Sequence, residues 1–273
     1  MGKLDWNKTK TIFIIVFSIL NVFLYSLYFI RYNEAQGIEY LGETSIEERL
    51  QADNIVYKGT PEKVVKDSYV SGNIRIFSPE ELKPLDNQSF EVFDRTQLVS
   101  TFKEPIAIGN TESLASFTQF INTHVFEGAS YELFNIDKDA KKAVFFQTIN
   151  GRQIFFNQNA RLTLYWNEDN EVYKYEQTAL EELEDFEQTE ILLPDERAVE
   201  VLYQRNLLKP NSTITSINLG YSTLVQLTEK QVFAPTWRVH VELHDGKNED
   251  YFINAVEGKI IEFNKTESLE IEK

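Results

Sequence analysis

The sequence has no cysteine and only three histidines, and these shortages restrict the chemistry available to the protein. Without thiols there is neither a cysteine nucleophile nor a disulfide, so an exported domain of this chain must be held together by its core alone. The short motifs of common enzymes are missing too: the chain has no G-x-S-x-G, Walker loop, G-x-G-x-x-G or H-E-x-x-H. We therefore predict a protein that is not an enzyme and that uses no cofactor.

Metal ligands at a suitable spacing are also lacking. His240 and His244 lie four residues apart in a strand-like segment, which separates their imidazoles by roughly 13 Å, so one zinc ion cannot bind both. We expect both side chains to face solvent. The segment Asn135–Asp139 begins like a calcium loop, but Ala140 stands where that loop needs glycine and Phe146 where it needs glutamate. No metal site is predicted.

Basic residues are scarce, since 27 Lys and Arg stand against 43 Asp and Glu, for a net charge of −16. Four of the basic residues and one of the acidic residues lie in the first 31 positions, which leaves 23 basic and 42 acidic residues for the rest. Nucleic acid and anionic lipid head groups repel so acidic a body. We exclude nucleic-acid binding, and a cysteine-free outer domain favours a bacterial cell surface.

One long apolar run stands out against this polar background. Thr11–Ile30, TIFIIVFSILNVFLYSLYFI, has twenty residues without a charge and is long enough to cross a bilayer core as a helix. Three lysines precede the run and Arg31 alone follows it, which favours a cytoplasmic N-terminus and an outer body. The alternative, a cleaved signal peptide, has a shorter apolar stretch and a small-x-small cleavage site. The run exits through bulky aromatics, which favours an uncleaved anchor.

The polar residues of the run fall on one predicted face. Steps of three and four residues connect six positions, which form one a/d seam of a left-handed helix pair: Thr11, Ile14, Ser18, Asn21, Tyr25 and Tyr28. An unpaired amide near the middle of a bilayer is costly, and a partner helix can satisfy it. The alternative is that the hydroxyls bond their own backbone and the tyrosines mark the outer interface. Both interpretations stay open at this point.

The remainder alternates between helical and strand-like segments. Helices are predicted where apolar residues recur every three or four positions behind a cap or a proline, at residues 44–54, 111–126 and 195–208. Strands are predicted at residues 73–77, 89–93, 143–149, 152–157, 161–166, 171–176, 214–221, 236–243, 250–255 and 259–263. The dipeptide Asn150-Gly151 between two of these strands is the strongest short hairpin signal.

A helix followed by about four antiparallel strands occurs twice, which indicates two related subdomains. We predict an α+β fold, with a single N-terminal transmembrane helix followed by a β-rich extracytoplasmic region of two similar helix-plus-antiparallel-sheet subdomains. The expected division is a cytoplasmic tail 1–10, a transmembrane helix 11–30, a juxtamembrane α/β segment 31–110, a first subdomain 111–180, an acidic linker 181–194 and a second subdomain 195–273. The acidic residues from Glu181 to Glu190 are expected to form a solvated helix face or linker, with a weak contact to a cation or a basic partner as the alternative.

Two segments resemble known families. Leu4–Leu24, with Asp5-Trp6-Asn7-Lys8 directly before the apolar run, resembles the N-terminal signature of the YycI family. These are single-pass regulators found beside the WalK/WalR (YycG/YycF) two-component system of low-GC Gram-positive bacteria. The C-terminal segments Trp237–Leu243 and Tyr251–Ile260 resemble PepSY-like repeats.

The YycI resemblance implies a function that composition and spacing do not. It implies a non-enzymatic regulator that contacts the sensor histidine kinase WalK (YycG) and a YycH-type companion through transmembrane helices and outer domains, and that tunes signalling in cell-wall homeostasis. The alternative is a membrane-tethered surface binding module, or a wall-directed hydrolase without a recognisable motif, for which the apolar helix is only a tether.

Overall fold

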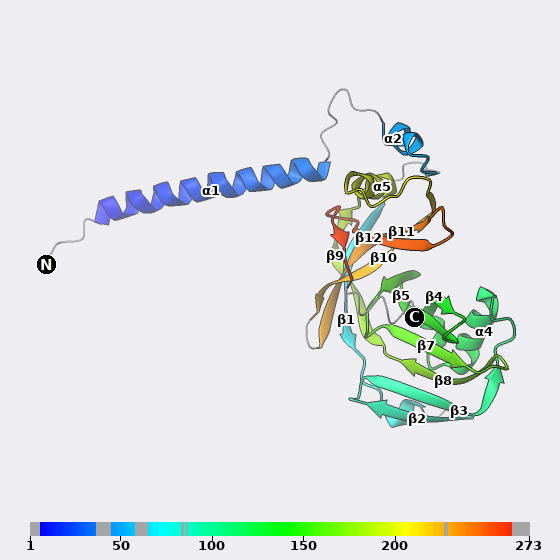
Figure 1. Ribbon diagram of the computed structural model, residues 1–273. Helices are drawn as coiled ribbons and strands as arrows, with labels where there is room; N and C mark the ends of the chain where they lie inside the picture. The colour runs from blue at the N-terminus through cyan, green and yellow to red at the C-terminus, as the bar shows by residue number, and fades with distance from the viewer. Residues whose placement is uncertain are drawn as a thin grey trace. The chain divides into compact units, whose positions relative to one another are not determined.

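The computed structural model describes residues 6–36, 45–57, 65–82, 85, 87–226 and 229–263 (Figure 1). The chain divides into two units, Met1–Arg49 and Leu50–Lys273. The first contains the long helix α1 (Trp6–Gln36), and the boundary between the units falls within the short helix α2 (Ile46–Ala52). The second contains the sheet described below.

Helix α1 is continuous through the whole apolar run. Its segment Lys10–Phe29 has a mean hydropathy of 2.3, and none of it is buried in the structure. Twenty residues of helix extend about 30 Å, the thickness of a bilayer core. Within the described residues, α1 is the helix that is long and apolar enough to cross a membrane.

The second unit is rich in strands. Its elements after α2 are, in chain order, β1 (Lys66–Ile74), α3 (Pro79–Leu82), β2 (Gln88–Phe93), β3 (Gln97–Ala107), α4 (Leu114–His124), the 3₁₀ turn η1 (Gly128–Ser130), β4 (Tyr131–Asp137), β5 (Lys142–Ile149), β6 (Arg152–Phe155), β7 (Arg161–Trp166), β8 (Glu171–Gln177), β9 (Leu180–Ile191), α5 (Asp195–Gln204), β10 (Thr213–Gln226), β11 (Lys230–Glu242), β12 (Asn248–Asn254) and β13 (Ile260–Ile261).

The first half of this unit is an antiparallel sheet with α4 packed against it. Neighbouring strands follow the order β4-β5-β7-β8-β3-β2. Helix α4 buries Phe117, Phe120 and Ile121, which lie at helical spacing on one face. The Phe117 ring lies 6.1 Å from the ring of Phe145 and 5.6 Å from that of Trp166, measured between centroids. Aromatic packing between helix and sheet thus forms the largest core cluster.

The second half is organised around the long strand β11. One edge of β11 pairs with β10, and its other edge pairs first with β1 and then with β12. Strand β13 extends this sheet beyond β12, and β9 extends it beyond β1. Helix α5 contacts β11 and buries Ala198, Val199 and Leu202 on one face. The polar residues of α5 therefore face away from the sheet.

A short parallel pair joins the two halves into one hydrogen-bonded network. Tyr221 and Ser222 of β10 pair with Ile154 and Phe155 of β6. The approach is close at Gly220, where a Cβ atom would lie 2.4 Å from two ring carbons of Phe155. The unit is therefore β-rich with a mixed sheet, and its two halves share strand pairing.

Several predicted elements are found where the sequence indicates them. The Asn150-Gly151 turn connects β5 and β6, and both of its residues have positive φ, +54° and +74°, as a type I′ turn requires. Helix α4 lies within residues 111–126. Helix α5 ends at Gln204, four residues before the predicted end at residue 208.

Two predicted segments differ from the structure. The strand expected at residues 73–77 lies earlier, as β1, which ends at Ile74 because the Phe77 amide beyond it bonds the Arg95 carbonyl outside the strand pairing. The acidic residues 181–190 are strand β9 paired with β1, so the predicted helix face or linker is wrong for this segment. Most side chains of β9 are exposed and many are charged, so the sequence does not show the alternation of apolar and polar residues that is typical of a strand. The PepSY likeness and the division into two subdomains stay predictions.

Candidate functional site

The first candidate site is the polar seam on α1. Its six predicted residues all lie in the continuous helix with exposed side chains: Thr11, Ile14, Ser18, Asn21, Tyr25 and Tyr28. An ideal helix drifts about 20° per heptad from a 3.5-residue repeat, which amounts to about 50° along the seam. A modest left-handed supercoil therefore keeps the seam facing one partner helix. Its role as a contact stays a prediction.

The polar groups of α1 differ in how they are satisfied. Ser26, which lies outside the seam, donates from its hydroxyl to the Phe23 carbonyl at 2.8 Å. Tyr25 stacks on Phe29 with ring centroids 6.4 Å apart. In the described part of the chain, the Asn21 amide has no hydrogen-bond partner. Asn21 is therefore the residue of the seam with the most to gain from a second helix in an apolar medium.

The second candidate site is a cavity of about 680 Å³ in the second unit. Strand β4 contributes Phe134, β11 contributes Arg238 and His240, and β12 contributes Asp250 and Phe252. The strand register places these residues together, because His240 pairs with Asp250 and Arg238 with Phe252. The pairing of the strands thus places polar and aromatic side chains on the walls of the same cavity.

A hydrogen-bonded trio forms the polar wall of this cavity. The Asp250 carboxylate accepts from Arg238 Nε at 2.9 Å and from Arg238 Nη2 at 2.8 Å. Its Oδ1 atom also lies 2.7 Å from His240 Nδ1. The guanidinium carbon lies 4.2 Å from the ring centroid of Phe134, in a cation–π contact. Arg238 is thus held both by a bidentate carboxylate and by an aromatic face.

Phenylalanine rings in mutual contact form the aromatic wall. The ring of Phe156 lies 5.1 Å from Phe134, 5.3 Å from Phe252 and 4.6 Å from Phe263, between centroids. Phe156 and Phe263 are nearly parallel, at 28°. Both are only partly buried, so part of this aromatic surface is accessible from the cavity.

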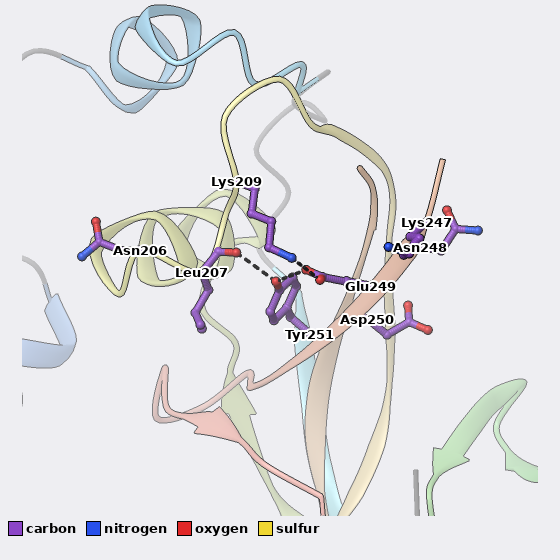
Figure 2. Close-up of a pocket in the computed structure, with 8 residues that line it drawn as sticks. All are labelled: Asn206, Leu207, Lys209, Lys247, Asn248, Glu249, Asp250 and Tyr251. Atoms are coloured by element: carbon purple, nitrogen blue, oxygen red, sulfur yellow. Dashed lines mark hydrogen bonds and ion pairs between the residues drawn. The ribbon is translucent and has the colours of Figure 1, made fainter. Parts of the chain in front are cut away.

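A neighbouring cavity of about 560 Å³ shares Leu207, Asn248, Asp250 and Tyr251 with the first (Figure 2). Lys209 and Glu249 point toward one another across it and form an ion pair. The Tyr251 hydroxyl lies 2.6 Å from Glu249 Oε2 and 2.9 Å from the Leu207 carbonyl oxygen. Lys247 pairs with Asp245, and Asp250 pairs with Arg238, so every charged group that lines this cavity already has a partner.

Ionisation in this cluster follows from its hydrogen bonds. Burial, together with the hydrogen bond to Glu249, raises the pKa of Tyr251 above its ordinary value. Burial also raises the pKa of Glu249, but hydrogen bonds from Lys209 and Tyr251 outweigh burial and hold it below the usual range. At neutral pH Glu249 is therefore a carboxylate and Tyr251 a neutral phenol.

The histidines and the calcium-like segment lie apart from one another and have different surroundings. His240 is held by Asp250, so the expectation that it only faces solvent is corrected, whereas His244 is exposed. In the calcium-like segment, Asp137 Oδ1 accepts from the Ala140 amide at 2.8 Å and closes a turn. Among the residues that the structure describes, no three His, Asp or Glu side chains are grouped to hold a metal ion.

Sequence reasoning did not predict the 680 Å³ cavity, although part of its signal was present. Arg238 and His240 alternate with buried residues along β11, so they share the outer face of that strand. The turn at Asp245-Gly246 sets a register that brings Asp250 opposite His240. The contribution of Phe134 and Phe156 comes from distant parts of the sequence, and no local pattern indicates it.

The family model described as "YycI protein" matches residues 36–256. This match starts at the end of α1, so Leu4–Leu24, the segment that resembles the family signature, lies outside it. An uncharacterized protein from Eubacterium rectale ATCC 33656 is similar in structure, with a TM-score of 0.43, 11% identity, and coverage of 77% of this chain and 89% of that chain. No match is found among curated proteins.

Proposed function

The chain belongs to the YycI family, a family of regulators in the pathway of the sensor kinase WalK (YycG) and not a family of enzymes, and from this membership we propose how it acts. It is a single-pass membrane protein that contacts a WalK-type kinase directly. It acts together with a YycH-type companion and thereby tunes signalling in cell-wall homeostasis. The family match over residues 36–256 is the observation that carries this proposal.

The proposed anchor is α1, with its N-terminus in the cytoplasm and the second unit outside. The length and hydropathy of Lys10–Phe29 support the anchor, and the lysines before it support the orientation. The absence of cysteine makes the topology easy to test. In intact cells, a membrane-impermeant maleimide is expected to label Lys138→Cys, whereas Lys8→Cys reacts only after lysis. The opposite labelling pattern would reverse the proposed orientation.

The proposed contact inside the bilayer is the seam on α1. Asn21 and Ser18 lie one helical turn apart on an exposed face, so both reach the same partner helix. Hydrogen bonds between membrane helices contribute roughly 0.6 to 2 kcal/mol each. Two such bonds are enough to bias a kinase between two signalling states, and the same seam can serve the YycH-type companion.

Span replacement tests whether α1 is more than a tether. An unrelated apolar helix of twenty residues replaces Lys10–Phe29, and the readout is transcription from a promoter controlled by the WalR-type response regulator. A regulator that works through its span loses its effect on this promoter while its level in the membrane stays normal. Full activity of the replaced protein would limit α1 to anchoring and transfer the contact to the outer unit.

The 680 Å³ cavity supports a second role, that of a surface binding module tethered by α1. This role is compatible with regulation, because a ligand of the outer unit can bias the contacts of a regulator. A wall-directed hydrolase is a poorer fit, since the family is one of regulators. The span replacement distinguishes the two roles: a pure binding module keeps its activity on any anchor.

A further inference from the structure

The 680 Å³ cavity has the dimensions and walls of a small-molecule site. Its volume lies within the range of roughly 300–1,000 Å³ that ligand sites occupy. Such sites combine apolar or aromatic walls with a few placed polar groups. Here the rings of Phe134, Phe156 and Phe263 form one side, and the trio of Arg238, His240 and Asp250 forms the other.

The charges that line the cavity limit the class of ligand: Arg238 and Asp250 oppose each other, and Glu262 adds a carboxylate. The Asp250 carboxylate accepts two hydrogen bonds from the guanidinium of Arg238 and neutralises its charge. The chain as a whole has a net charge of −16, which repels anions. A cationic ligand would bind best over an aromatic face, but the Arg238 guanidinium already lies over the ring of Phe134 and would repel it. The wall therefore suits a neutral molecule.

Hydrogen-bonding capacity nevertheless remains in this wall. A guanidinium has five N–H groups, and Asp250 takes two of them. The imidazole of His240 uses Nδ1 toward Asp250, which leaves Nε2 for a ligand. A ligand that both donates and accepts hydrogen bonds matches these groups, and hydroxyl groups do both.

We propose that this cavity binds a neutral pyranose sugar. The apolar C–H face of the ring packs against the accessible surface of Phe156 and Phe263, and the hydroxyl groups on its edge bond Arg238 and His240. Phe134 and Asp250 hold Arg238 in place and do not need to contact the sugar. This proposal depends on the cavity alone and stands whether or not the chain regulates a kinase.

Saturation-transfer difference NMR on the full chain tests the proposal. The protein is held in dodecylphosphocholine micelles, whose head group is not a sugar, and empty micelles serve as the blank. The probes are two neutral disaccharides, cellobiose and N,N′-diacetylchitobiose, and one amphipathic anion, 4-fluorophenylacetate. The variants are Arg238→Met and Phe156→Leu, with Lys138→Met as the control, because Lys138 is an exposed cation that does not line the cavity. Thermal melting of each variant reports whether it folds.

The expected result is saturation of the ring C–H protons of at least one disaccharide. Arg238→Met removes one charge-assisted hydrogen bond and Phe156→Leu removes one ring contact, so each weakens that binding at least about tenfold. Lys138→Met leaves the binding unchanged. Absence of transfer to both disaccharides would overturn the proposal. So would binding that both folded cavity variants retain, or binding of 4-fluorophenylacetate alone, which would make the cavity an anion site.

Discussion

Replacing Gly220 with alanine tests how closely the two halves of the second unit are joined. A Cβ atom at this position would lie 2.4 Å from Phe155 Cε2 and Cζ and 2.6 Å from the Gln153 carbonyl oxygen, at least about 1 Å inside ordinary contact. The Phe155 ring is 2% exposed and the oxygen belongs to the backbone, so neither neighbour can move away easily. The substitution therefore strains the β6–β10 pair.

The size of the effect follows from two opposing contributions. Overpacking a core costs up to about 3 kcal/mol, and the smaller entropy of an unfolded alanine offsets about 0.4–1 kcal/mol of this. The expected net loss in the free energy of unfolding is about 2 kcal/mol. For a unit of this length, each kcal/mol lost from the free energy of unfolding lowers the melting temperature by about 2–4 °C. The expected decrease in the melting temperature is therefore about 4–8 °C.

Gly72→Ala is the matched control for this measurement. A Cβ atom there would lie 2.6 Å from Leu183 Cδ2, the end of a flexible and partly exposed side chain that can shift. Thermal melts followed by circular dichroism on the full chain are expected to show a near-wild-type midpoint for Gly72→Ala and a lower one for Gly220→Ala. An unchanged or raised midpoint for Gly220→Ala would refute the close junction of the two halves.

Three further outcomes are expected. Burial lowers the pKa of His124, so near pH 6 the unfolded chain binds more protons than the folded chain. The free energy of unfolding therefore falls as the pH drops below about 6.5. His124→Gln is expected to reduce this pH dependence in urea titrations between pH 7 and 5. Asp67→Ala leaves Arg152 and the buried Tyr221 hydroxyl without their acceptor and costs about 1–3 kcal/mol by urea unfolding; a loss below about 0.5 kcal/mol would contradict this account. Glu112→Ala breaks an exposed ion pair and changes stability by less than about 1 kcal/mol in the same assay.

Local patterns were informative wherever one short segment decides its own structure. Asn150-Gly151 needs positive φ at both positions, and few other dipeptides accept that geometry, so the hairpin could be predicted. Phe117 and Ile121 of α4 recur at helical spacing and are buried, so that helix could be predicted, but Leu114, which the same spacing places on the inner face, is 58% exposed. The segment Leu162–Trp166 alternates, and all three of its apolar side chains are buried.

Features that depend on distant residues could not be predicted. Strand β9 forms because it pairs with β1, which lies more than a hundred residues earlier in the chain. Its exposed charged residues are typical of a linker, so the sequence did not indicate a strand. The parallel β6–β10 pair likewise joins segments far apart in the chain. In the cavity, the histidine spacing suggested only exposed side chains, because the sequence does not show that Asp250 would lie opposite His240.

The central claim, that α1 recognises its partners inside the bilayer, is tested most directly by cross-linking in native membranes. The wild type is compared with Ser18→Leu/Asn21→Leu, and Ser26→Leu serves as the control because its hydroxyl bonds its own backbone. The account predicts that the double variant loses cross-links to the WalK-type kinase and the YycH-type companion at a normal protein level, whereas Ser26→Leu keeps them. Equal cross-linking by all three proteins would contradict the seam and transfer recognition to the outer unit.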